Sequence, residues 1–161
     1  MPIDASSVFF HHLDEVPFMD LTANLDKARP APGSKARIKW LGGDSATGPW
    51  VYYIEHPQGA IIKPHKHHAP RIEYVLEGEI EFFLGKDAVA WFRGDTSITG
   101  SLHGAGSLSY VPSGTIYAYR ITEESKLLHV FYENPVGHTV HVSADPTDDS
   151  HEGDSHEAEG N

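Results

Sequence analysis

The sequence of 161 residues contains no cysteine, and it has only 12 Lys and Arg residues against 23 Asp and Glu. The absence of cysteine excludes disulfide frameworks, zinc ribbons and thiolate nucleophiles. A net charge of −11 disfavours nucleic acid and anionic membranes as partners, because both repel an acidic protein. No apolar run approaches the length of a membrane span, and the first residues lack the pattern of a signal peptide. We therefore expect a cytoplasmic protein.

The negative charge is concentrated at one end of the chain. Residues 142–161 contain seven of the acids and no Lys or Arg, so most of the net charge belongs to this segment. The same segment has few apolar residues, which predicts a disordered acidic tail over 143–161. The length predicts one domain. We expect residues 1–36 to form an N-terminal arm that packs on a barrel of residues 37–142.

Short segments rich in β-branched and aromatic residues alternate with Gly and Pro turns, and helical periodicity is almost lacking. Clear strand patterns lie at residues 37–41, 50–56, 71–76, 79–84, 126–132 and 139–142. Residues 85–87 read as a hairpin turn, with a returning strand over 88–92. These patterns predict an all-β sandwich or barrel.

The stretch GAIIKPHKHHAPRIEYVLEG, residues 59–78, carries the strongest chemical signal. His65 and His67 are two apart in a segment of strand character, so both imidazoles point to the same face. Two converging imidazoles suit a divalent metal ion. The alternative is a pair of partly buried histidines that only make hydrogen bonds at the end of a strand.

This stretch resembles the first motif of the cupin family, G-x5-H-x-H-x3-E-x6-G. Gly59, His65, His67 and Gly78 fall on their places, but Arg71 stands where the family has a glutamate ligand. The pattern is most similar to the ChrR-like cupins and to the acetylacetone and dihydroxyacetophenone dioxygenases, in which iron is held by histidines.

Residues 106–120, GSLSYVPSGTIYAYR, resemble the second cupin motif, G-x5-P-x-G-x2-H-x3-N. Gly106, Pro112 and Gly114 match it, and Tyr117 stands in place of the last histidine ligand. The resemblance implies a cupin jelly-roll β-barrel, also called a double-stranded β-helix. Two of the four usual ligand positions are altered.

The remaining metal ligands are therefore open from the sequence. Glu73 has the strand parity of His65 and His67 and could complete a set of two histidines and one carboxylate, or it could pair with Arg71. His129 and His103 are further candidates, from a neighbouring strand and from a long loop respectively.

Tyr117 and Arg71 are the candidate catalytic residues. Tyr117 should point into the cavity and could donate a hydrogen bond to a metal-bound oxygen or a substrate carbonyl, or it could simply fill the barrel. Arg71 cannot bind a metal cation, but its guanidinium could bind a carboxylate or an enolate. Its alternative role is a salt bridge to Glu73.

The resemblance implies a non-haem Fe(II) dioxygenase that cleaves a C–C bond in a small diketone, enol or hydroxy-ketone; Zn, Mn, Ni or Cu are the alternative metals. A second possibility is a non-catalytic cupin that binds a small molecule or a metal. A third is a metal-dependent lyase or isomerase on the same fold, since folds of this kind host many functions. A homodimer is implied by the resemblance alone.

Overall fold

The structure is a computed structural model that describes residues 12–19, 36–43, 48–132 and 139–141. It confirms the prediction of an all-β protein. The elements of this part of the chain are, in order, the 3-10 helix η1 (Leu13–Glu15), the strands β1 (Arg37–Gly43), β2 (Trp50–His56), β3 (Ile61–His67) and β4 (Arg71–Leu84), the helix α1 (Gly85–Phe92), and the strands β5 (Ser101–Gly104), β6 (Leu108–Val111), β7 (Tyr117–Phe131) and β8 (Thr139–His141).

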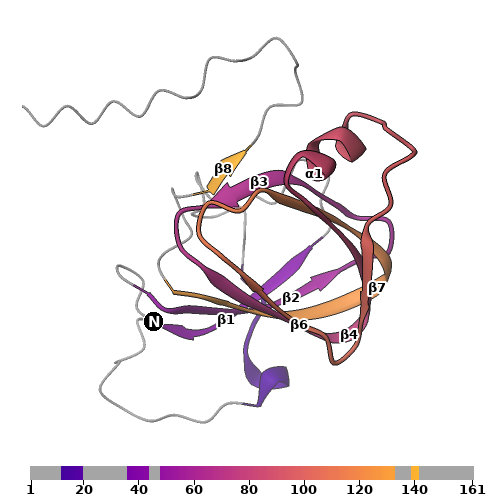
Figure 1. Ribbon diagram of the computed structural model, residues 1–161. Helices are drawn as coiled ribbons and strands as arrows, with labels where there is room; N and C mark the ends of the chain where they lie inside the picture. Colours follow the sequence, from indigo (N-terminus) through magenta and orange to yellow (C-terminus); the bar gives the residue numbers. More distant parts are fainter. Residues whose placement is uncertain (1–11, 20–35, 44–47, 133–138, 142–161) are drawn as a thin grey trace, which may run out of the picture.

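The two long strands β4 and β7 organise the barrel. They are paired antiparallel along almost their whole length, and the register is irregular between Val75 and Ile80. The first part of β4 also pairs with β6, and its last part pairs with β5. In β7 the first part pairs with β3 and the last part with β2. The eight strands of the described part form one continuous sheet. Its two halves, β5-β4-β7-β3-β8 and β6-β4-β7-β2-β1, share the long pair, act as the two sheets of the barrel and enclose one interior (Figure 1).

A glycine sits where the two long strands pass from one sheet to the other. Gly78 has a φ of +79°, and a Cβ atom there would lie 2.1 Å from the backbone oxygen of Glu124. The hydroxyl of Ser125 donates to the backbone oxygens of Glu79 and Glu123 at 3.2 Å and 2.6 Å. Residues 122–125 thus continue β7 through this irregular region.

Strand alternation fills the interior with apolar side chains. One buried cluster joins both sheets and consists of Val75, Ile80, Phe82, Val111, Tyr117, Tyr119, Ile121 and Leu127. Phe82 stacks on Tyr117, with ring centroids 5.4 Å apart and planes 7° apart. Large flat rings in this arrangement stabilise the packing beyond their area burial.

The prediction of a turn and a strand over residues 85–92 is wrong, because this segment forms α1. Ala88 is fully buried and clusters with Phe83 and Ala118. Trp91 stacks on Phe83 with ring centroids 4.0 Å apart. Ala88 and Trp91 are three apart and so lie on one helix face, and packing against the outside of β4 and β7 outweighs the β propensity of Val89, Trp91 and Phe92.

Residues 12–19 lie against β1. The backbone N–H of Met19 donates to the oxygen of Ile38 at 2.7 Å, and the Lys39 ammonium donates to the oxygen of Leu13 at 2.8 Å. The rest of the expected arm and the expected tail, residues 143–161, lie outside the described residues. Among the helices that the structure describes, none has the length and apolarity to cross a membrane.

Replacing Gly78 with alanine should destabilise the protein by about 3 kcal/mol, because a positive φ and a backbone clash act together. Gly106→Ala is the matched control, since Gly106 has a φ of +88° but nothing within 4 Å of its Cβ position. It should cost only about 1 kcal/mol. Urea unfolding measures both, and equal costs would show that the close approach at Gly78 contributes nothing.

Candidate functional site

A buried group of polar side chains lies inside the barrel, next to the apolar cluster. On adjacent strands Glu73 of β4 is in register with His129 of β7, which is in register with Tyr52 of β2. Arg71 is one strand repeat away on the same face. Arg71 is 3% exposed, Glu73 1% and His129 2%. Charged side chains are this deeply buried only when they are paired.

Arg71 and Glu73 form that pair. A guanidinium nitrogen of Arg71, Nη2, donates to Oε2 of Glu73 at 2.6 Å. The guanidinium carbon also lies 4.2 Å from the ring centroid of Tyr117 and 5.7 Å from that of Phe131. A buried cation over aromatic faces is stabilised by their quadrupoles. The salt bridge that the sequence left as an alternative is thus present.

The surrounding titratable groups are shifted by burial. Burial raises the pKa of Glu73, and the positive charge of Arg71 offsets only part of that rise. Burial lowers the pKa of His129 well below its usual range, and the charge of Arg71 acts in the same direction. It also lowers the pKa of His56 to about 4. At neutral pH these two imidazoles are uncharged.

His65 and His67 lie side by side, as their spacing predicts. Their ring centroids are 5.0 Å apart. Nδ1 of His65 is 2.7 Å from the backbone oxygen of Lys63, which can only accept, so Nδ1 carries the proton and Nε2 has the lone pair. His65 is in register with Tyr117, and the two rings are 4.3 Å apart. The histidine pair therefore borders Tyr117, in the same interior as Arg71.

The side chains that the structure describes do not fit a resident metal ion. Among the described residues, no three His, Asp or Glu side chains converge closely enough to hold one. Glu73, the expected third ligand, is engaged by Arg71. Burial raises the pKa of Tyr117, which disfavours the phenolate that a metal would need. The guanidinium of Arg71, which cannot bind a metal cation, lies near Tyr117 in the same interior.

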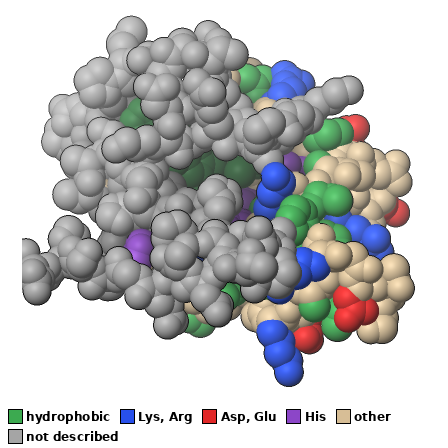
Figure 2. Space-filling model, turned by 90° about the horizontal axis from the view of Figure 1, so that it is seen from above, with side chains coloured by type: hydrophobic (Ala, Val, Ile, Leu, Met, Phe, Trp, Pro, Cys, Tyr) green, Lys and Arg blue, Asp and Glu red, His purple; other side chains and the backbone are tan. Residues whose placement is uncertain are grey.

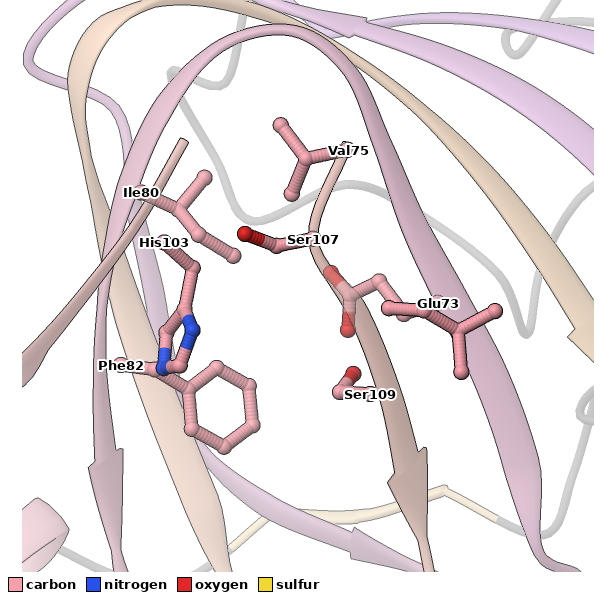
Figure 3. Close-up of a pocket in the computed structure, with 8 residues that line it drawn as sticks. Glu73, Val75, Ile80, Phe82, His103, Ser107 and Ser109 are labelled. Carbon is pink, nitrogen blue, oxygen red and sulfur yellow. The ribbon is translucent and has the colours of Figure 1, made fainter. Parts of the chain in front are cut away.

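A small pocket of about 40 Å³ is lined in part by Glu73 and His103, the other candidate metal ligands. It has room for about three water-sized groups. Figure 3 shows the polar ends of Glu73, His103, Ser107 and Ser109 around it. Its apolar walls are Val75, Ile80, Phe82 and Leu108. Nε2 of His103 is 2.8 Å from the hydroxyl of Ser101. Glu73 and His103 thus meet at a pocket.

Sequence reasoning did not single out His56, Ser107 or Ser109. His56 shares strand parity with Tyr52 and Ile54, so alternation along β2 could have placed it inside. Ser109 faces Glu73 across the β4–β6 pairing, and Ser107 accepts a hydrogen bond through its backbone oxygen from the N–H of Val75. No local pattern reveals such a cross-strand neighbour, because it depends on the register.

Several buried polar atoms of the interior have no hydrogen-bond partner in the described part of the chain. They include Nε of Arg71, the hydroxyl of Tyr117 and both ring nitrogens of His56. Buried polar groups normally have a partner, so such groups mark a place suited to polar ligands or water.

On the molecular face seen in Figure 2, charged side chains of both signs alternate with apolar side chains in the described part of the chain.

Replacing Arg71 with methionine should cost about 3 kcal/mol or more at pH 7, because it leaves the buried carboxylate of Glu73 without its counter-ion. The penalty should shrink as the pH falls, since the raised pKa lets Glu73 take up a proton in the folded state. Urea unfolding at pH 7 and pH 5 measures both effects. Adding Glu73→Met to the variant should recover most of the loss, whereas strictly additive costs would mean that the two side chains are not coupled.

Comparison with known proteins supports the fold and no closer relationship. No family model matches the sequence, and no curated protein does. One similar solved structure is an RmlC-like cupin from Shewanella frigidimarina, with a TM-score of 0.56 and 18% identity over 81% of this chain and 94% of that one. A second is the polyketide cyclase RemF from Streptomyces resistomycificus, with a TM-score of 0.60 and 17% identity over 88% of this chain and 92% of that one. A third is a putative acetylacetone dioxygenase from Methylibium petroleiphilum, with a TM-score of 0.58 and 18% identity over 89% of this chain and 86% of that one. Together with the shared pair of long strands and the two motif stretches, these likenesses show that the chain has the cupin jelly-roll fold.

Proposed function

We propose that this protein is an enzyme that acts on a small carbonyl compound by metal-independent acid–base catalysis, in the pocket beside Glu73. The observation that carries the proposal is a buried carboxylate that lines a pocket and whose pKa is raised by burial. Titratable groups that line a pocket and have a shifted pKa are candidates for catalysis.

Glu73 is suited to take a proton from a substrate. Its Oε2 is held by Arg71, and its Oε1 lies 3.4 Å from Nε2 of His129. The carboxylate is thus held by a cation at Oε2, while Oε1 has no hydrogen-bond partner in the described part of the chain. A general base works best when its pKa lies nearer to neutrality than that of an exposed carboxylate, and burial shifts Glu73 in that direction.

Other groups that line the pocket can stabilise developing negative charge. Ser107 and Ser109 supply hydroxyl groups, and His103 supplies an imidazole. All three side chains can donate a hydrogen bond to a carbonyl oxygen. Donors that are fixed before the reaction begins are an effective means of stabilising an oxyanion.

The proposed step moves one proton. Glu73 removes it from the carbon next to the carbonyl, and the electron pair of the C–H bond passes into an enolate whose negative charge rests on oxygen. The enolate then recovers a proton from Glu73, at the same carbon or at another atom of the substrate. The products are an exchanged or isomerised carbonyl compound, and no oxidant is needed.

Size and likeness support the choice of substrate class. A pocket of about 40 Å³ has room for about three water-sized groups, so we propose that it takes a very small compound or the carbonyl end of a larger one. Two proteins with a similar fold are named as a polyketide cyclase and a putative acetylacetone dioxygenase, so both names refer to ketone compounds. Ketones have the acidic C–H bonds that a carboxylate base can attack.

We expect the EDTA-treated protein to catalyse hydrogen–deuterium exchange at the α-carbon of at least one member of a panel of small ketones and hydroxy-ketones. Glu73→Gln should slow the exchange about 100-fold or more, since general-base catalysis contributes about that much. Proton NMR in D₂O follows the loss of the α-proton signal.

Glu81→Gln is the control for this experiment. Glu81 is also a buried carboxylate of β4, but it accepts from the N–H of Gly100 at 2.9 Å and pairs with Arg120, away from the pocket. This variant should keep the wild-type exchange rate. Exchange at equal rates in Glu73→Gln and wild type would reject Glu73 as the base, and ligand binding without any exchange would identify a binding module.

The iron-dependent dioxygenase implied by the sequence resemblance is the competing proposal. One observation favours it: the hydrogen bond from Nδ1 of His65 to the oxygen of Lys63 leaves Nε2 with a lone pair, as in histidines that bind metals. The ligands would be His65, His67 and a group still to be found, with Zn, Mn, Ni and Cu as alternatives to iron.

Elemental analysis of the purified full chain separates the two proposals. The wild type is compared with the double variant His65→Ala/His67→Ala. We expect the two proteins to differ by less than one tenth of a transition-metal ion per chain, because Arg71 lies in the same interior as the histidines. The full chain has twelve histidines, so the difference between the two proteins is the relevant quantity. A loss of about one metal ion per chain would favour the dioxygenase.

A small-molecule substrate is part of the present proposal. A homodimer and a cytoplasmic location remain predictions from the sequence and its resemblance.

A further inference from the structure

We propose that the guanidinium of Arg71 is a built-in cation that takes the place of a metal ion in this barrel, and that it closes a latent metal site formed with His65, His67 and Tyr117. Replacing Arg71 with glutamate and Tyr117 with histidine should open that site. This inference concerns the metal chemistry of the chain and does not rest on the function of Glu73.

Side chains from three strands meet at the proposed site. His65 and His67 come from β3, Tyr117 from β7 and Arg71 from β4. The ring centroid of Tyr117 lies 4.3 Å from that of His65 and 6.1 Å from that of His67. The guanidinium carbon of Arg71 lies 4.2 Å from the Tyr117 centroid. Tyr117 therefore lies next to both the ring of His65 and the guanidinium of Arg71.

The surroundings of Arg71 are those of a bound cation. The aromatic rings of Tyr117 and Phe131 lie near its guanidinium, and Glu73 supplies the counter-charge. Arg71 is 3% exposed, so water screens this charge little. The charge of a guanidinium is permanent and pairs with the carboxylate of Glu73, so that carboxylate is not left to attract a divalent ion.

The histidine pair, in contrast, keeps the orientation that a ligand needs. The backbone oxygen of Lys63 holds Nδ1 of His65, so its lone pair is on Nε2. Fixing one ring nitrogen in this way orients a metal-binding imidazole and sets its tautomer. The two changed positions would add a carboxylate and an imidazole to two imidazoles, a donor set that suits borderline divalent metals.

Cobalt is the probe for this proposal, because Co²⁺ bound to histidine and carboxylate absorbs visible light. The full-length wild type and the double variant Arg71→Glu/Tyr117→His are treated with EDTA, titrated with Co²⁺ and analysed for bound cobalt after gel filtration. We expect the double variant to bind one more Co²⁺ per chain than the wild type. Its affinity for this ion should be at least 100-fold higher than that of any wild-type site that involves His65. A further variant that also carries His65→Ala and His67→Ala should lose this ion, and histidines elsewhere in the chain contribute equally to all samples.

A second variant tests the proposal even if the double variant does not fold. Arg71→Met/Glu73→Met removes the buried ion pair without adding a ligand, and it should raise the affinity of the His65–His67 pair for Co²⁺ at least tenfold over the wild type. Circular dichroism and a cooperative thermal transition confirm that each variant is folded. The proposal is overturned if a folded double variant gains no cobalt, if removing the ion pair leaves the affinity unchanged, or if the wild type already binds Co²⁺ tightly through His65. Each of these outcomes is independent of the deuterium exchange that tests Glu73.

Discussion

The ion pair between Arg71 and Glu73 is the interaction on which the interior of this barrel depends. Both side chains are almost fully buried, and each would be unfavourable there without the other. Their charges also act on the groups around them. The positive charge of Arg71 helps to keep His129 and His56 neutral and offsets part of the rise in the pKa of Glu73. Stability and the chemistry of the site therefore share one pair of residues.

The fold makes this concentration of polar groups possible. Because β4 and β7 belong to both sheets, the same strands contribute Arg71 and Glu73 at one end and Phe82 and Tyr117 at the other. The irregular region at Gly78 brings the two parts onto opposite walls of one interior. Stacked aromatic rings then fill the space between them, so a polar cluster lies directly against an apolar core.

A cupin fold does not require that metal chemistry be retained, since function belongs to the site and not to the fold. Here the two histidines of the first motif remain paired, while a guanidinium and a phenol stand at the other two motif positions. The same interior offers a carboxylate with a raised pKa, hydroxyl groups and an imidazole at a pocket. These are the components of proton transfer, which needs donors and acceptors in fixed positions rather than a Lewis acid.

The sequence by itself determined most of the strands, the shared face of His65 and His67, and the cupin resemblance, because alternation, turn residues and motif spacing are local properties of the chain. It did not determine the helix at 85–92, where packing on Phe83 and Ala118 outweighs local β propensity. Nor could it choose between a metal ion and Arg71 as the partner of Glu73, or place Ser109 opposite Glu73. Only the tertiary structure decided these contacts, because they depend on strand register and on which buried charges come within a few ångströms of one another.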